Sequence, residues 1–195
     1  MVEKRFRFHD GGEKGGLPAL GSFLRCDLED CVSIEGLRSL SDSVVTIKMH
    51  GKIFERHRNP DGSVGGFVEE GAAVSPRAFL GKDAVVLEHA QVLDRSSVTG
   101  RSTISGNAKV LSMSRVRGGV EVSDNAVIDD NALVDNHVKV SGNAFVGGNA
   151  RLFDYVTVSG DARIVGNSTL LGAIEVLGAE ILNNAVIVPS AFYDD

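Results

Sequence analysis

The sequence predicts an all-β protein whose main body is a single-stranded parallel β-helix, a triangular prism in which each coil of the chain pairs with the next. Two observations lead to this fold class. Residues 68–188 carry an aliphatic residue at every sixth position without interruption, and a second modulation recurs every eighteen residues. Internal repeats of this kind outweigh local patterns in deciding a fold. We therefore expect a small β-rich cap at 1–67, the β-helix at 68–188 and a short tail at 189–195.

The six-residue period predicts one short strand in each hexad. Val, Ile or Leu occupies every sixth position from Val68 to Val188, and no insertion shifts the frame. The fourth residue after each aliphatic is expected to be the second inward-facing one, and it is mostly Ala or Ser. A small inward residue allows the chain to bend tightly near a corner. The frame predicts Val188 as the last aliphatic of the core.

The eighteen-residue period predicts three strands in each coil. The second inward position holds a larger residue at Val120, Val138, Val156 and Ile174, which are eighteen residues apart. Every third hexad therefore stacks on the same face, and one coil is a triangle. Twenty hexads make about six to seven coils. With strands about 4.8 Å apart, the prism would be roughly 30 Å tall.

The third residue after each aliphatic is expected to form the corner. It is often Asn, Asp, Gly or His, the residues that best tolerate a positive φ. In the eighteen-residue register these residues form columns: Asn107, Asn125, Asn143 and Asp161; Asn131, Asn149 and Asn167; and, at a neighbouring position, Ser105, Ser123, Ser141 and Ser159. We expect stacked amides and hydroxyls to bond to one another along the axis, in a structural role.

Residues 1–67 lack the hexad. An alternating apolar run at 44–54, a helical turn near 34–40 and a turn at Asn59-Pro60-Asp61-Gly62 predict a small β-rich unit. The end of a β-helix exposes unpaired strands and an open core, so this unit is expected to cover it. At the other end, Pro189 should stop the ladder, and Ala191, Phe192 and Tyr193 can fold over the core.

Composition limits the possible environments and partners. No window approaches the ~18 unbroken apolar residues of a membrane span, and residues 1–16 lack the apolar segment of a secretory signal. A cytoplasmic protein with no membrane partner is therefore expected, with Cys26 and Cys31 as free thiols. The net charge is −6, and residues 68–195 hold sixteen acids against ten bases. This surplus argues against nucleic-acid binding.

The pattern aliphatic-x-x-(Asn/Asp/Gly)-small-x resembles the bacterial hexapeptide-repeat proteins. The start of the repeat, residues 62–75, and the Gly-Asn-Ala-x-Val units at 106–110 and 142–146 are similar to YdcK-like and phage-encoded members, with Phe67 in place of the usual Trp. The resemblance implies a left-handed β-helix of bacterial or phage origin. It also implies a homo-oligomer, with a trimer favoured.

Many hexapeptide-repeat proteins are acyltransferases, so the resemblance also implies a possible use of acetyl-CoA, with a His as general base between subunits. Such enzymes usually carry a loop between coils and a C-terminal helix, and this sequence shows neither. The candidate catalytic residues are His89 and His137, which are forty-eight residues apart and so fall in different columns; Asp135 is near His137 in sequence. The clustered histidines of the β-helical carbonic anhydrases are absent, so no metal site is predicted.

Outward-facing apolar residues suggest contacts with other chains. The expected oligomer or partner surface near the end of the repeat comprises Phe153, Val165, Leu171, Leu177, Ile181 and Ile187. A similar set near the start comprises Phe79, Val85, Leu87 and Leu93, and the middle coils read as more polar. In an alternative interpretation, the cap and the tail cover these two sets.

The sequence therefore favours a non-catalytic rigid scaffold or partner-binding protein without a cofactor. An acetyl-CoA-dependent acyltransferase with a site between subunits is the alternative. Capture of a small ligand or another protein between subunits is a third hypothesis.

Overall fold

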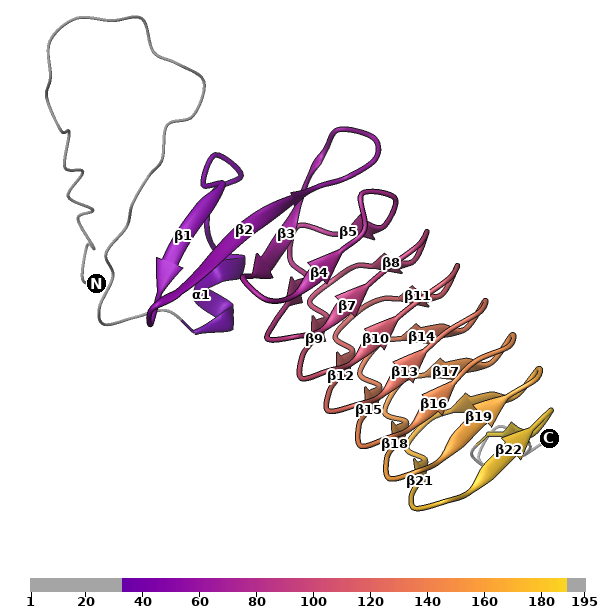
Figure 1. Cartoon of the computed structure of the whole chain (residues 1–195). Helices are drawn as coiled ribbons and strands as arrows, with labels where there is room; N and C mark the ends of the chain where they lie inside the picture. Colours follow the sequence, from indigo (N-terminus) through magenta and orange to yellow (C-terminus); the bar gives the residue numbers. More distant parts are fainter. Residues whose placement is uncertain (1–32, 189–195) are drawn as a thin grey trace, which may run out of the picture.

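The computed structural model describes residues 33–188 and contains one short helix and 23 strands (Figure 1). The N-terminal unit holds α1 (Ile34–Arg38), β1 (Thr46–Met49), β2 (Lys52–Arg58) and β3 (Val64–Glu69). The remaining strands wind along one axis as a parallel β-helix of about seven coils. The all-β class and the β-helix are thereby confirmed, whereas its left-handedness stays a prediction from the resemblance.

The coils stack into three sheets. Sheet A runs β1-β2-β3-β6-β9-β12-β15-β18-β21 and adds to the N-terminal strands β6 (Val85–Val86), β9 (Thr103–Ile104), β12 (Glu121–Val122), β15 (Lys139–Val140), β18 (Thr157–Val158) and β21 (Glu175–Val176). Sheet B contains β4 (Ala73–Val74), β7 (Gln91–Val92), β10 (Lys109–Val110), β13 (Val127–Ile128), β16 (Phe145–Val146), β19 (Arg163–Val165) and β22 (Ile181–Asn183). Sheet C contains β5 (Phe79–Leu80), β8 (Ser97–Val98), β11 (Arg115–Val116), β14 (Leu133–Asp135), β17 (Arg151–Phe153), β20 (Thr169–Leu171) and β23 (Val186–Ile187).

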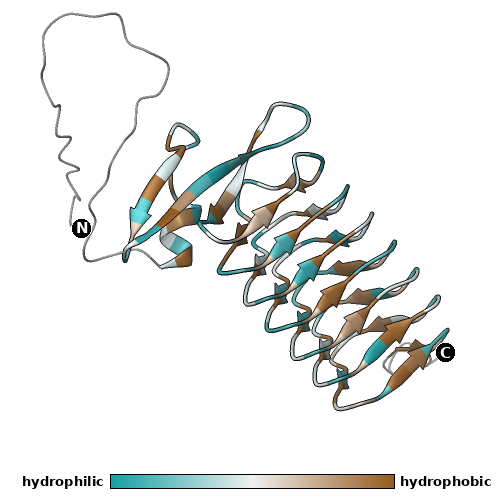
Figure 2. Cartoon of the chain, in the orientation of Figure 1, coloured by the Kyte–Doolittle hydropathy of each residue, from teal (hydrophilic) through white to brown (hydrophobic). Residues whose placement is uncertain are grey.

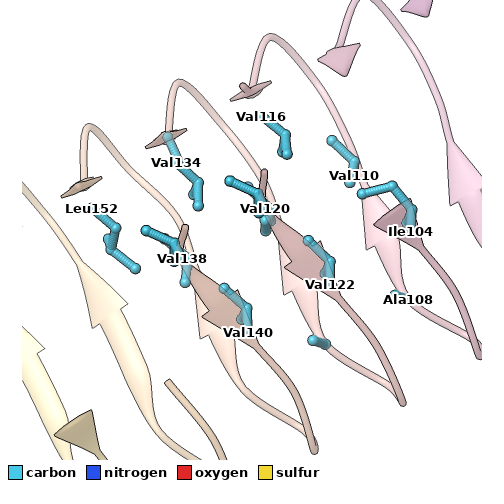
Figure 3. Packing of buried hydrophobic residues seen from close by; sticks show 14 of the residues in the cluster. Ile104, Ala108, Val110, Val116, Val120, Val122, Val134, Val138, Val140 and Leu152 are labelled. Carbon is cyan, nitrogen blue, oxygen red and sulfur yellow. The ribbon is translucent and has the colours of Figure 1, made fainter. Parts of the chain in front are cut away.

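The strand register confirms the eighteen-residue coil. Val122 pairs with Ile104 on one side and with Val140 on the other, in parallel. Almost the whole series of hexad aliphatics is fully buried inside the prism, as the close view of the central coils shows (Figure 3). The larger column of Val120, Val138 and Val156 is also fully buried. The hydrophobic effect on these side chains, about 25 cal/mol per Å² of apolar surface buried, drives the coiling.

Serine replaces alanine at several of the small inward positions without leaving a buried polar group unpaired. Ser96, Ser102, Ser114 and Ser168 are fully buried. In each, the hydroxyl donates to the backbone carbonyl three residues earlier, at 2.6–2.8 Å. This local bond offsets the cost of removing the hydroxyl from water.

The corners differ from the prediction by one residue. From Glu88 to Asn184, every sixth residue has a positive φ, between 55° and 98°. This is the second residue after each aliphatic, whereas the third was expected. Gly, Asp and Asn fill most of these positions, so the predicted residue chemistry is right. Figure 2 shows the corners in hydrophilic colours and the strands partly in hydrophobic ones.

The last coil breaks the predicted frame. Leu170 pairs with Ile187, a separation of seventeen residues, so Ile187 and not Val188 packs against the core. Val186, predicted to face inward, is 69% exposed. Glu180, at another predicted inward position, is also exposed. The charged Glu180 would be costly to bury without a partner, and the last coil leaves more of its residues exposed than the coils before it.

The N-terminal unit continues sheet A. β2 pairs antiparallel with β1 and with β3, and β3 pairs in parallel with β6 of the next coil. β3 therefore belongs to both the N-terminal unit and the β-helix, across the predicted boundary at residue 67. The helical turn and the 59–62 turn lie where the sequence predicts them. The N-terminal unit buries its own apolar cluster of Leu37, Ile47, Phe54, Phe67 and Val85 against the outer face of sheet A.

Two arginines attach this unit to the first coils. Arg56 is 9% exposed, and its guanidinium donates to the carbonyls of Leu40, Gly65 and Lys82. Arg38 donates to the carbonyls of Asp83 and Arg101. Burial lowers the pKa of both guanidinium groups. Each arginine thus links backbone carbonyls of separate segments and holds the N-terminal unit against the first coils.

Candidate functional site

The two candidate histidines lie at different corners of the prism, as predicted. His137 is at the corner after sheet C, and its ring stacks on Tyr155 with a centroid separation of 5.2 Å and an interplanar angle of 11°. Asp135 does not contact His137 through any hydrogen bond; it forms an ion pair with Arg117. Within one chain, Asp135 is therefore not placed to assist His137 as a general base.

His89 lies at the corner after sheet A, in the column that continues as Asn107. Its ring is near Gly71 of the first coil, where an added β-carbon would be 3.5 Å from Nδ1. No hydrogen bond of the His89 ring occurs among residues 33–188. A catalytic role for either histidine stays a prediction, because it would require groups from another chain.

The asparagine columns form hydrogen-bonded ladders, as predicted. Nδ2 of Asn107 donates to Oδ1 of Asn125. In the same way, Nδ2 of Asn125 donates to Oδ1 of Asn143, and Nδ2 of Asn143 donates to Oδ1 of Asp161, at 2.9–3.1 Å. Asn131, Asn149 and Asn167 form a second ladder. The serine column also lines up, but no hydrogen bond joins its hydroxyls in the described chain. These ladders use the corner amides for structure.

We expect Asn125→Ala to lower the free energy of unfolding by about 1–2 kcal/mol, because one bond received and one bond donated are lost. Chemical denaturation measures this change. Ser123→Ala in the same coil is the matched control, since the Ser123 hydroxyl forms no hydrogen bond within the described residues. Equal stability of the two variants would show that the ladder contributes nothing.

The predicted partner surface near the end of the repeat does not form one patch. Val165 and Ile181 lie on sheet B, Phe153 and Leu171 are paired neighbours on sheet C, and Leu177 follows a strand of sheet A. Ile187 lies against the core, so its predicted outward position is wrong. The one-residue shortening of the last coil is the physical reason.

The apolar residues predicted to face outward near the start of the repeat also do not form one patch. Val85 is buried, and Leu87 packs against the same cluster beneath the N-terminal unit. Here the alternative interpretation, that the cap covers them, is confirmed. Phe79 remains 37% exposed, and Leu93 is half-buried on sheet B.

Sheet B carries an apolar stripe that the sequence reasoning missed. We call it the sheet B stripe; its apolar residues are Leu93, Leu111, Val127, Phe145, Val165 and Ile181. Each shares its strand with a second outward position, filled by Gln91, Lys109, Asp129, Gly147, Arg163 or Asn183. On β9, β12, β15 and β18 of sheet A the outward positions hold Thr103, Ser105, Glu121, Ser123, Lys139, Ser141, Thr157 and Ser159. The prediction that the middle coils are more polar is therefore right for sheet A, whereas sheet B mixes polar and apolar outward residues. Reading the sequence in steps of eighteen would have separated the two faces.

Two members of the stripe are paired neighbours, and a cation–π contact extends the stripe to the next strand. Val127 pairs with Phe145, and the guanidinium of Arg163 lies over the Phe145 ring at 4.5 Å from its centroid. Beyond Arg163, Ile181 is 67% exposed, and Met113 at the adjoining corner is 57% exposed. Contiguous apolar surface of this kind marks interaction sites more often than isolated residues do.

Two shallow hollows adjoin the N-terminal unit. One, of ≈ 370 Å³, lies between β2 and the first coil and is lined by residues that include Glu55, His57 and Val74. Nε2 of His57 donates to the Ala78 carbonyl at 3.2 Å, and burial lowers the pKa of His57. The other, of ≈ 250 Å³, lies between α1 and the corner at Glu88. Neither hollow contains a candidate histidine.

Within residues 33–188, no group of three or more His, Cys, Asp or Glu side chains is arranged to hold a metal ion. Cys26 and Cys31 lie outside the described residues, as does the tail with Phe192 and Tyr193. In the same described range, no helix is long and apolar enough to cross a bilayer. Comparison of the chain with protein-family models, with curated proteins and with solved structures finds no match.

Proposed function

We propose that this protein is a non-catalytic, rigid β-helix scaffold that binds other protein chains, and that a second copy of itself docks on the sheet B stripe. The observation that carries this proposal is the set of apolar outward residues on sheet B, compared with strands β9, β12, β15 and β18 of sheet A, where every outward residue is polar. The unbroken coils support it, because a parallel ladder bonded at every coil presents both faces with little freedom to move. Membership of the hexapeptide-repeat proteins, a YdcK-like or phage origin, a cytoplasmic location and a trimeric state belong to the same proposal.

Phe145→Glu is expected to break this self-association. The wild-type chain should sediment as an oligomer of its 20.6-kDa subunit, whereas the variant should raise the dissociation constant at least about 100-fold, because a carboxylate would lose its water at an apolar contact. Sedimentation velocity over a range of concentrations measures both.

Thr157→Glu provides the matched control for Phe145→Glu. Thr157 holds the same outward position on β18 of sheet A and is similarly half-buried. The control should associate like the wild type. A wild-type protein that stays monomeric up to high concentration would contradict the proposed self-docking.

The acyltransferase that uses acetyl-CoA is the second candidate, and the exposed corner position of His137 is the observation that favours it. In this alternative, a neighbouring subunit would supply the rest of the site. Titration calorimetry with acetyl-CoA should then show saturable heat with the assembled protein, and His137→Ala should abolish turnover but not assembly. The scaffold proposal predicts no heat.

A further inference from the structure

Tyr155 presents an open ring face at the corner between sheets C and A. Its side chain is 64% exposed, and one face of the ring stacks on His137 of the preceding coil. Eighteen residues further along the same column stands Ala173, which is exposed and has only a methyl group. Because coils are spaced by about 4.8 Å, the place one stacking distance beyond Tyr155 has no side chain to fill it.

Sheet B, another face of the prism, contains a pair that shows what can stack on an aromatic ring one coil away. Phe145 and Arg163 are also eighteen residues apart, and the guanidinium lies 4.5 Å from the ring centroid. Arg56 stacks on Phe67 at 4.2 Å in the N-terminal unit. The spacing between paired strands, which is also the spacing between coils, therefore suits a guanidinium over an aromatic ring. At the Tyr155 corner, Ala173 occupies the position that corresponds to Arg163.

A carboxylate one residue before Tyr155 in sequence is the second group of the proposed site. Asp154 directly precedes Tyr155, and its Oδ1 accepts a hydrogen bond from Nδ2 of Asn136 at 3.0 Å. Its Oδ2 accepts none within the described residues. Arg117, two coils before this corner, is paired with Asp135. A carboxylate with a free oxygen next to an aromatic face matches the planar guanidinium group, which stacks and donates in the same plane.

We propose that this corner binds an arginine side chain of a partner protein, with the guanidinium stacked on Tyr155 and paired with Asp154. The proposal rests on the proposed function and specifies the partner chemistry. The surplus of acids over bases in residues 68–195 adds a favourable field for a basic segment. A neutral sugar ring could stack on the tyrosine but would not need the carboxylate charge.

The experiment uses the full chain and an acetylated, amidated tri-arginine peptide as the probe. The sequence has no Trp and two Tyr, so in a Tyr193→Phe background the intrinsic fluorescence reports Tyr155 alone. We expect a saturable change with tri-arginine that weakens with added salt. Tri-citrulline, which is planar but uncharged, should bind about tenfold more weakly, since it loses both the cation–π and the ion-pair contribution.

Three variants locate the site. Tyr155→Leu and Asp154→Asn should each weaken tri-arginine binding severalfold. Because Tyr155→Leu removes the fluorescent ring, its binding is measured from the NMR chemical shifts of backbone amides. Ala173→Arg should block it by placing the chain's own guanidinium over Tyr155. Ala179→Arg adds the same charge in the same coil at the next corner and should leave binding largely intact.

The outcomes separate this proposal from the proposed function. Binding that is equal for tri-citrulline, or unchanged in Tyr155→Leu, overturns the arginine site. Loss of binding in Ala179→Arg as great as in Ala173→Arg also overturns it, because charge alone would then account for binding. If these results occur while wild-type assembly through Phe145 persists, only the arginine site is wrong. If tri-arginine binds specifically to a monomeric wild type, only the self-docking is wrong.

Discussion

Replacement of Gly66 by alanine is expected to lower the free energy of unfolding by about 3 kcal/mol, the upper end of the cost of overpacking. Gly66 lies in β3, where the N-terminal unit meets the first coil. A β-carbon at this position would overlap the carbonyl oxygen of Ala84 and stand 2.7 Å from that of Gly81. Both are backbone atoms, so relief requires β3 to move away from the coil and weakens its pairing with β6.

Urea denaturation should show this loss as a lower midpoint, and thermal unfolding as a melting temperature about 10 °C lower for a chain of this size. Gly119→Ala is the matched control, because its added β-carbon would be 3.4 Å from Cδ2 of His137 and its φ is not positive. This control should change stability by no more than about 0.5 kcal/mol. A Gly66→Ala variant as stable as the control would mean that β3 does not lie so close to the coil in solution.

Arg56→Met is expected to release the N-terminal unit while the coils beyond it stay folded. The guanidinium serves buried carbonyls on three separate segments and stacks on Phe67 at 4.2 Å. Methionine fills a similar volume but donates nothing, so the carbonyls of Leu40, Gly65 and Lys82 lose their partner. We expect a loss of about 3 kcal/mol, in the range measured for hydrogen bonds to charged groups and buried ion contacts.

Hydrogen exchange detects where this loss acts. Amides in residues 34–69 should exchange much faster in Arg56→Met, whereas those of the central coils should keep their protection, because each coil depends mainly on its neighbours. Arg58→Met is the control, since Arg58 is exposed and donates only to the Gly62 carbonyl. Uniformly faster exchange along the whole chain would contradict a local role for Arg56.

The candidate surfaces were only partly predictable, and the reason is geometric. The predicted partner residues Phe153 and Leu171 are paired neighbours, as their eighteen-residue spacing suggests. The sheet B stripe and the Tyr155 corner were missed, although His137 and Tyr155, and Phe145 and Arg163, have the same spacing. Aligning outward residues by eighteen would have found them. No periodicity could show that Asp135 pairs with Arg117 rather than with His137, because that choice depends on side-chain orientation.

The sequence by itself determined the β-helix, its three faces and its asparagine ladders. Each coil places equivalent residues in the same environment, so the same residue types recur every eighteen positions and the pattern is visible in the sequence. The tertiary structure alone decided which corner residue takes the positive φ, that Ile187 replaces Val188 in the last coil, and that Val85 lies beneath the N-terminal unit. These features occur at the ends of the repeat or depend on contacts between segments distant in sequence. Such contacts leave no repeating signal along the chain.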